Sequence, residues 1–485
     1  MNNVYQGRSI LKPSVPLAAV LVLACGAQLM VVLDGLIVSV ALPDMRTGLD
    51  LTPTGQQWVV AGYLVTVGGL LLLAARVADL IGHRRIFIAG LAVFTLASLA
   101  GGLAQTGEVL IAARLVQGAG AAALAPSSLS LLTLTHTGEQ RARALSLWSA
   151  TSGSAGALGL VLGGVITSGL GWRWVLLVNV PIGIALWVVA AMTLAPDVAR
   201  KRRRIDLLGA VSVTVAVGAL TYAISRADSG WGSKSVVVAL IAAAAFTVLF
   251  IVNEQRAAQP LIPLSIFRHR NLVVGNLTIA AIGAVMTATV YFLSLYQQRI
   301  LDLSPLRTGL ALVPMSIVLT VGALASKRLL QKYGAHRLII TGSLNMAIGL
   351  AWLAAIPSHS LYLTHVLGAT LIWGLGASIV VMPCVALATS DVDPDQAGLA
   401  SGLVNTARQV GGAIGLAVLA SIANTAATHS GTGDPASKIV HGYSIAFITS
   451  AAIAVLISLS TLAARTPKTQ PPANVTAEPS RSTEA

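Results

Sequence analysis

The sequence ADLIGHRRIFIAG at residues 78–90 returns in altered form as LQKYGAHRLIITG at residues 330–342. The identical pairs include Gly82 with Gly334, Arg85 with Arg337 and Gly90 with Gly342. A second pair of stretches, GALG at 156–159 and GAIG at 412–415, follows in the same order along the chain. Internal repeats of this kind indicate that two halves of the chain share one fold.

The composition excludes a protein that folds in water. Of 485 residues, 55% are hydrophobic and 10% are charged, with a mean hydropathy of +0.81, whereas soluble domains carry about 25% charged residues. A soluble globule, a nucleic-acid binder and a disordered chain are therefore excluded. Cys25 and Cys384 both lie in apolar runs, which argues against a disulfide-stapled extracellular fold.

Fourteen apolar stretches are long enough to cross a bilayer as helices, which need about 20 residues each. They lie at about 16–42, 57–76, 86–106, 109–132, 143–168, 173–195, 206–225, 235–252, 271–297, 308–327, 337–356, 361–389, 400–426 and 443–464. The first six and the last six spans form the two halves, with the remaining pair inserted between them. We therefore predict an all-α polytopic membrane protein made of two six-helix bundles plus two inserted helices.

The predicted organisation has five segments. These are a cytoplasmic N-terminus at 1–15, an N-terminal six-helix bundle at 16–195, a basic loop with the inserted helix pair at 196–270, a C-terminal six-helix bundle at 271–465, and a tail at 466–485. The tail is rich in Pro, Ser and Thr, which predicts disorder. The basic run from Arg200 to Arg204 is most simply a topology anchor beside anionic lipid.

The distribution of the net charge of +14 predicts the orientation in the membrane. The predicted outer loops carry few basic residues, namely Arg46, Arg173, Arg226, Lys234, Arg299, Arg307 and Lys438. Arg114 lies within a span, and the other Lys and Arg residues, Arg408 included, fall on the side of the N-terminus. By the positive-inside rule, this asymmetry predicts a multi-pass protein of the cell membrane with both termini in the cytoplasm.

Asp34 is the acidic residue that lies deepest within a predicted span. A charged residue at mid-membrane costs roughly 2.5–3.5 kcal/mol on insertion scales, and such residues usually face a cavity or a partner and carry function. Desolvation favours the protonated form of a carboxylic acid, which suits a group that exchanges protons. We expect Asp34 to act in the cleft between the two halves. The alternative is a neutral aspartate that holds helices together by hydrogen bonds.

Arg114 is the basic residue within the fourth span. Near Asp34, its permanent charge would oppose protonation of the acid, and a substrate that disturbs the pair would couple two ligands to one carboxylate. The alternative is an arginine that snorkels to the outer interface, helped by Glu108. Gln117 and Asn405 are further polar candidates for substrate binding, although hydrogen bonds between spans would explain both.

Other residues point to substrate contact, gating or helix movement. Tyr291 and Tyr296 are aromatic candidates for substrate binding, as are Trp148, Phe292 and Trp373, although anchoring at the interface explains each equally well. The loop between the second and third spans contains Asp79, Arg84 and Arg85. An acid there can bind an arginine or a helix N-terminus and close a cytoplasmic gate; a solvated turn is the alternative.

Small residues share helix faces in the fifth and thirteenth spans. Such faces permit either sliding or tight packing. The residues are Gly153, Gly156, Gly159, Gly163, Gly411 and Gly415.

Motifs for other energy sources are missing from the sequence. It contains no GxxxxGK[ST] nucleotide loop, and its histidines do not occur at metal-ligand spacing. We therefore expect a transporter rather than an enzyme, with no metal and no cofactor, driven by an ion gradient or by the gradient of its substrate.

Several motifs together resemble the major facilitator superfamily, and within it the fourteen-span drug:proton antiporter branch of EmrB/QacA type. The resemblance covers about residues 15–465. The motifs are the span-1 stretch from Leu33 to Pro43, the loop from Ala75 to Arg85, the span-4 stretch from Arg114 to Gly120, the span-5 stretch from Gly156 to Gly164 and the span-13 stretch from Asp395 to Gly412. The resemblance implies that Asp34 serves protonation or substrate binding and that Arg114 and Gln117 take part in proton coupling.

This chain departs from the family pattern at a few positions. Leu36 and Ser39 stand where threonine and asparagine are usual, and Leu160 replaces the usual proline after Gly159. In the loop motif, Ala75, Leu80 and His83 replace the usual residues. These departures affect the hydrogen bonding of the pocket, the distortion of the fifth span and the strength of the gate.

The resemblance implies proton-coupled efflux of drug-like or amphipathic small molecules across the cytoplasmic membrane by alternating access. A dedicated exporter of one natural product, siderophore or metabolite is the alternative, and the residues do not separate the two. A membrane sensor that does not transport is a third hypothesis. We expect a monomer that contacts a small-molecule substrate, protons and lipid, and no nucleic acid.

Overall fold

The computed structural model describes residues 17–462, except for 196, 198–205, 228–229, 358–361, 394–395 and 432–433. The predicted terminus at 1–15, the tail at 466–485, the run from Arg200 to Arg204 and Asp395 lie outside the described residues. Within the described part, fourteen helical spans are long and apolar enough to cross a membrane. This confirms the predicted number of spans and the all-α fold class.

The N-terminal half consists of six spans, the last of which is made of two helices. The helices are α1 (Leu17–Gly48), α2 (Pro53–Ile81), α3 (His83–Gly102), α4 (Gly107–Thr135), α5 (Gly138–Leu170), α6 (Arg173–Leu177) and α7 (Asn179–Thr193). Several run beyond the predicted ends, because hydropathy marks only the apolar part of a helix, whereas capping residues fix where it begins. Thr52, for example, accepts a hydrogen bond from the backbone of Gly55 and starts α2 just before Pro53.

The inserted pair and the C-terminal half follow. The pair is α8 (Leu207–Ser225) and α9 (Lys234–Arg256), and a short 3₁₀ helix, η2 (Leu264–Arg268), leads to the second half. That half contains α10 (Arg270–Arg299), α11 (Pro305–Ala311), α12 (Val313–Tyr333), α13 (Ala335–Ala354), η3 (Tyr362–Val366), α14 (Leu367–Thr389), α15 (Ala397–His429) and α16 (Pro435–Leu462).

The predicted continuous span at 173–195 is broken between α6 and α7. Pro181 has no backbone N–H and cannot bond to the carbonyl of Leu177, the last residue of α6. The chain therefore restarts its helix at Asn179. The break places the Asn179 side chain in the interior of the half, where its exposed fraction is 0%.

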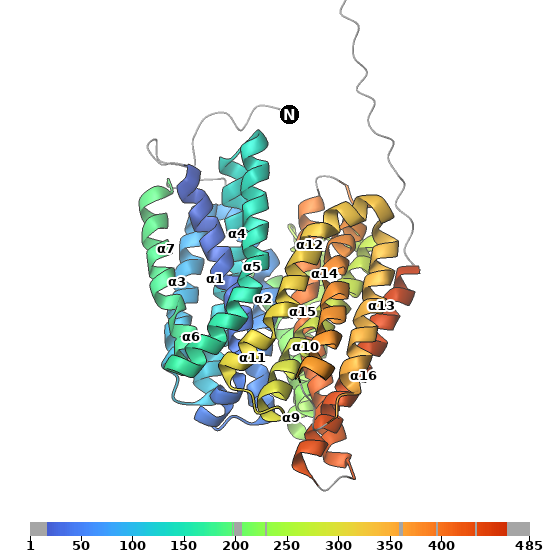
Figure 1. The fold of residues 1–485 in the computed structure, drawn as a ribbon. Helices are drawn as coiled ribbons and strands as arrows, with labels where there is room; N and C mark the ends of the chain where they lie inside the picture. The colour runs from blue at the N-terminus through green and yellow to red at the C-terminus, as the bar shows by residue number, and fades with distance from the viewer. Residues whose placement is uncertain are drawn as a thin grey trace, which may run out of the picture.

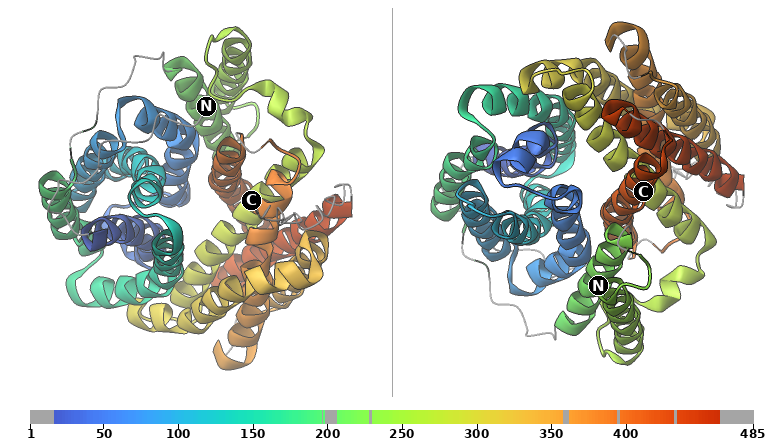
Figure 2. Two further views of the ribbon diagram at one scale, coloured as in Figure 1. Left: turned by 90° about the horizontal axis from the view of Figure 1, so that it is seen from above. Right: turned by 90° about the horizontal axis from the view of Figure 1, so that it is seen from below.

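The two halves stand side by side, with the inserted pair at one edge of the interface between them (Figures 1 and 2). Helix α8 packs on α2 of the first half and on α15 of the second. Hydrogen bonds join the halves toward the end of α1 farther from the N-terminus: the Ser294 hydroxyl donates to the carbonyl of Ser39 at 2.8 Å, and the Gln298 amide to that of Val40 at 2.9 Å. At this end the halves are in direct contact.

The sequence repeat corresponds to a structural one. Gly82 ends α2 and precedes α3 with φ of 116°, and Gly334 ends α12 and precedes α13 with φ of 79°. Residues with a side chain rarely adopt such backbone angles, which explains glycine at both positions.

The structure places one basic residue of the topology argument differently. Arg408 lies within α15 and not in a cytoplasmic segment, because this helix begins well before it.

Candidate functional site

Asp34 and Arg114 form an ion pair inside the N-terminal half. The Arg114 Nη1 atom lies 2.5 Å from Asp34 Oδ2 and joins α4 to α1. The exposed fraction is 0% for Asp34 and 1% for Arg114. Arg114 therefore does not snorkel to the membrane surface, and that alternative is wrong. Asp34 and Arg114 lie close together, as expected from the sequence.

Helix α2 holds the guanidinium of Arg114 in place. Its Nε atom donates a hydrogen bond of 3.0 Å to the carbonyl of Val59. The guanidinium carbon lies 4.4 Å from the centre of the Tyr63 ring, a distance at which a cation is attracted to the face of an aromatic ring. Three helices thus fix one cation beside one acid.

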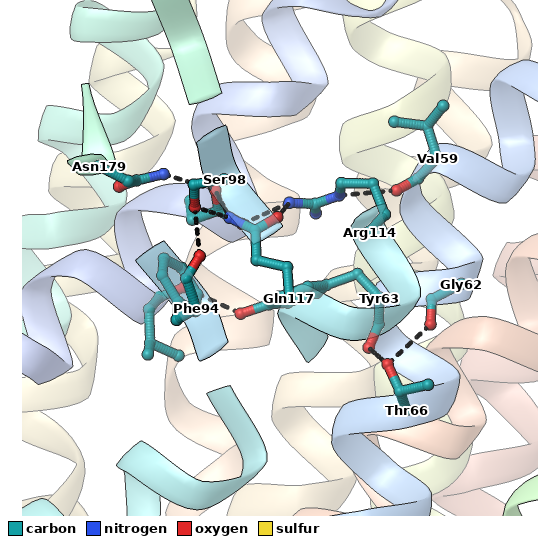
Figure 3. A network of polar contacts seen from close by, with 11 residues as sticks. Val59, Gly62, Tyr63, Thr66, Phe94, Ser98, Arg114, Gln117 and Asn179 are labelled. Atoms are coloured by element: carbon teal, nitrogen blue, oxygen red, sulfur yellow. Dashed lines mark hydrogen bonds and ion pairs between the residues drawn. The ribbon is translucent and has the colours of Figure 1, made fainter. Parts of the chain in front are cut away.

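Gln117 links the two charges to a third polar side chain, and Figure 3 shows it between Arg114 and Ser98. Its Oε1 atom accepts a 2.5 Å hydrogen bond from Arg114, while its Nε2 atom donates to Asp34 Oδ1 and to the Ser98 hydroxyl, each at 2.8 Å. Gln117 lies one helical turn after Arg114, which puts both side chains on the same face of α4. Ser98 donates in turn to the carbonyl of Phe94.

Asn179 completes the network, and sequence reasoning missed it. Its Nδ2 atom donates a hydrogen bond of 2.9 Å to Asp34 Oδ1, and its Oδ1 atom has no hydrogen-bond partner among the described residues. The proline two residues later marks a helix start within an apolar run, and an asparagine at such a start is a detectable signal. Ser98 carried no signal in the sequence.

Three side chains donate to the carboxylate of Asp34. They belong to Arg114, Gln117 and Asn179, and hydrogen bonds to an ionic partner are stronger than those between neutral groups. Removing one partner of a buried ion pair leaves the other charge uncompensated. The arrangement therefore ties α1 to α4 and α7 through one acid.

The expected position of Asp34 in the cleft between the halves is wrong for this conformation. All of its partners belong to the N-terminal half, and no part of its side chain is exposed. The next residue explains the difference: a Cβ atom built on Gly35 would meet nothing within 4 Å. Because successive residues in a helix point about 100° apart, α1 turns Gly35 toward open space and Asp34 toward α4 and α7.

The other tentative substrate residues lie in separate places. Tyr291 lines a cavity at the end of the molecule where α1 finishes. The Tyr296 hydroxyl donates to the carbonyl of Pro357 at 3.2 Å, and its side chain is buried. Asn405 is exposed on α15. The structure therefore does not gather Tyr291, Tyr296 and Asn405 with Asp34 into one site.

The turn between α2 and α3 uses an acid that the sequence did not single out. The Asp197 carboxylate accepts hydrogen bonds from the backbone N–H groups of Arg84 and Arg85 at 3.3 and 2.9 Å. Asp79 lies 3.5 Å from His83, and the Arg84 guanidinium donates to the carbonyl of Ala191. The expected binding of an acid to this helix N-terminus therefore occurs through Asp197, which arrives from beyond α7.

The glycine faces pack helices closely in both halves. A Cβ atom on Gly159 or Gly163 of α5 would come within 3.0 or 2.8 Å of a carbonyl oxygen of α1, whereas one on Gly156 would meet only the Leu36 side chain at 3.4 Å. In the second half, a Cβ atom on Gly411 or Gly415 of α15 would overlap α10. Tight packing is therefore observed, and the sliding of these faces stays a prediction.

Comparison with known proteins supports the expected family. The model of the Major Facilitator Superfamily matches residues 24–416. The chain is 42% identical over 447 residues to the cephamycin export protein CmcT of Amycolatopsis lactamdurans, with 91% of each protein covered. It is 40% identical over 462 residues to the puromycin resistance protein pur8 of Streptomyces alboniger, covering 91% of this chain and 90% of that protein.

Solved structures share the fold at low sequence identity. A peptide transporter POT in complex with sulfate aligns with a TM-score of 0.67 and 15% identity, covering 92% of this chain and 94% of that one. The xylose transporter XylE from E. coli, in an inward open conformation, aligns with a TM-score of 0.60 and 14% identity, covering 92% and 96%. Family match, relatives and fold agree with the motifs, and the chain belongs to the major facilitator superfamily.

Proposed function

We propose that this transporter exports drug-like or amphipathic small molecules across the cytoplasmic membrane in exchange for protons, by alternating access. The observation that carries the proposal is the buried pair of Asp34 and Arg114, a titratable acid beside a permanent cation in a membrane-spanning half. Intramembrane ionisable residues of this kind mark ion and proton pathways. The relatives named for cephamycin export and puromycin resistance support the direction of transport and the substrate class.

In the proposed cycle, Asp34 alternates between an ionised, paired state and a protonated state that is released from Arg114. The ion pair with Arg114 and the hydrogen bonds from three donors to the carboxylate support the paired state of this cycle. Because Asp34 lies inside the N-terminal half, helices of that half would have to rearrange in the outward-open state to admit water and allow a proton to bind. Return to the inner side and binding of substrate would restore the pair and release the proton, so that cargo and proton compete through one acid.

The proposed orientation places both termini in the cytoplasm, and the proton gradient supplies the energy without a cofactor. The hydrogen bonds from Ser294 and Gln298 to α1 then close the outer side. We assign the turn held by Asp197 to the cytoplasmic side, where it would tie the start of α3 to the end of the first half. A monomer contains every residue of the Asp34 network.

A dedicated exporter of one natural product is the second candidate. The observation in its favour is that two relatives of at least 40% identity are each named for a single antibiotic. A panel of chemically different antibiotics, tested on cells that overexpress the protein, separates the two candidates. Protection against one compound indicates a dedicated exporter, and protection against several unrelated compounds indicates a polyspecific pump.

The decisive experiment measures proton movement directly. Purified protein is reconstituted into liposomes that contain a pH-sensitive dye, and candidate substrates, puromycin first, are added under an imposed pH gradient. Asp34→Asn should abolish substrate-dependent proton flux, because an amide cannot carry the exchanged proton. Asp44→Asn, a half-buried acid later in the same helix, is the matched control and should retain flux.

Two outcomes would contradict the proposal. Full proton-driven transport by Asp34→Asn would reject Asp34 as the carrier. Substrate binding by the wild type without any transport in liposomes would favour a membrane sensor. Insertion of each variant is checked by its yield and by size-exclusion chromatography, so that loss of transport is not mistaken for loss of folding.

A further inference from the structure

A cavity of about 250 Å³ lies between the two halves, at the end of the molecule where α1 and α10 finish and α2 and α16 begin. Helices of both halves, together with the last residue of α8, contribute to its wall. The residues of the Asp34 network do not line it. The cavity is therefore separate from the buried ion pair.

The charged groups of the cavity are all cations. Arg46 enters from α1 of the first half and Arg299 from α10 of the second, and no Asp or Glu is among the described residues that line the wall. The two guanidinium groups repel each other. Like charges held in one cavity across an interface are unfavourable unless an anion lies between or beside them.

Two buried glutamines add donors without acceptors. Gln56 and Gln57 line the cavity with exposed fractions of 1% and 4%, and the Nε2 atom of each has no hydrogen-bond partner among the described residues. The Gln56 Oε1 atom accepts a hydrogen bond of 2.9 Å from Arg299, which fixes the orientation of that amide. An unsatisfied buried donor costs about 1–3 kcal/mol, so this site favours a ligand that accepts hydrogen bonds.

Aromatic rings line the same cavity. Tyr291 and Phe292 meet nearly edge to face, with ring centres 5.4 Å apart, and Phe292 lies 5.3 Å from the ring of Tyr443. All three line the cavity, where the Tyr443 hydroxyl is hydrogen-bonded to Arg299, and they present ring surface to anything bound beside the arginines. The cavity thus combines two cations and unsatisfied donors with aromatic surface.

We propose that this cavity is a binding site for an amphipathic organic anion, with a carboxylate or similar group between Arg46 and Arg299 and an apolar body against Tyr291, Phe292 and Tyr443. Gln56 and Gln57 donate hydrogen bonds to the anionic group. Because Arg46 and Arg299 belong to different halves, the anion bridges them and holds this end of the molecule closed. The binding site does not rest on the proposed function.

Binding of a matched pair of probes tests the site. 2-Naphthoate and its neutral analogue 2-naphthamide are titrated into the purified full-length protein by calorimetry. Naphthoate should bind more tightly than naphthamide, with an affinity that falls as salt is raised. Arg46→Gln with Arg299→Gln should weaken naphthoate binding about tenfold or more, because charged hydrogen bonds are lost, and should leave naphthamide nearly unchanged.

Two further variants guard against misfolding and against a general charge effect. Gln57→Glu places a negative charge in the cavity with almost no change of shape, and it should abolish naphthoate binding. Arg307→Gln removes an exposed cation from α11 that does not line the cavity, and it should bind naphthoate as the wild type does. Equal affinity for both probes, or unchanged naphthoate binding in the double arginine variant, would overturn the proposal.

The source of the anion is determined by changing the lipid. In nanodiscs of phosphatidylcholine alone, naphthoate binding indicates a free organic acid as ligand. If phosphatidylglycerol in the disc competes with naphthoate in the wild type but not in the double arginine variant, an anionic lipid also occupies the site. Asp34→Asn should retain naphthoate binding, so failure of the proton-exchange scheme would leave this inference intact. Likewise, failure of naphthoate to bind would leave the proton-exchange scheme intact.

Discussion

The two halves share a helix arrangement but differ in what they bury. The first half encloses Asp34 and Arg114 in a network of five polar side chains. Among the described residues of the second half, no Asp, Glu, Lys or Arg is buried, and a cluster of aromatic rings from α10 and α16 packs there instead. The helix arrangement is therefore shared, while the buried ion pair belongs to the first half and the buried aromatic cluster to the second.

The largest effect is expected from breaking the ion pair. Arg114→Met leaves the Asp34 carboxylate buried without its cation and should destabilise the protein by about 3–5 kcal/mol. Thermal unfolding of purified protein in detergent measures the change. Arg408→Met, which removes a half-buried cation of the second half, should have a much smaller effect.

A double variant sharpens this test. Asp34→Asn combined with Arg114→Met removes both charges, so it should unfold at a higher temperature than Arg114→Met alone, while remaining inactive in transport. If the double variant is no more stable than the single one, the pair does not act as a coupled unit.

A smaller effect is expected from the helix crossings. Gly411→Ala places a methyl group against the backbone of α10, which must shift, and should cost about 1–3 kcal/mol. Gly156→Ala, where the nearest neighbour is a flexible leucine at 3.4 Å, should be close to neutral. Equal unfolding temperatures for the two variants would show that the crossings of the two halves are equally loose.

The paired turns give a third comparison. Gly82→Ala and Gly334→Ala both force a side chain into a positive φ, at about 1–2 kcal/mol each. The new methyl group at residue 82 would also displace the carboxylate of Asp197, whereas a Cβ atom at residue 334 meets nothing within 4 Å. Gly82→Ala should therefore be the less stable variant in a thermal unfolding series, and the reverse order would exclude a structural role for Asp197.

The smallest expected effect concerns Asn179. Asn179→Ala removes one of three donors to Asp34 and should cost about 0.5–1.5 kcal/mol, with folding retained. Because the lost donor contacts the proposed proton acceptor, substrate-dependent proton flux in liposomes should fall below that of the wild type. Unchanged flux would mean that Asn179 supports only the packing of α7.

Sequence reasoning succeeded where the signal is local along the chain. Hydropathy located the spans, and the charges of Asp34 and Arg114 within those spans marked them as candidates. It could not find Ser98 or Asp197, because each acts on a residue distant in sequence. It missed the break before Asn179, because a count of apolar residues passes over the signal that Asn179 and Pro181 give. It placed Asp34 in the wrong surroundings, since hydropathy does not say which way a residue within a span points.

The sequence by itself determined that this chain crosses a membrane fourteen times in two related halves and carries an acid and a cation within its spans. These properties follow from the length and polarity of contiguous segments, because each span must by itself be long and apolar enough to cross the hydrocarbon core. Only the tertiary structure decided that Asp34 turns into its own half and that Arg46 and Arg299 meet across the interface. Helix rotation and crossing set those contacts, and they arise from packing between segments far apart in the chain.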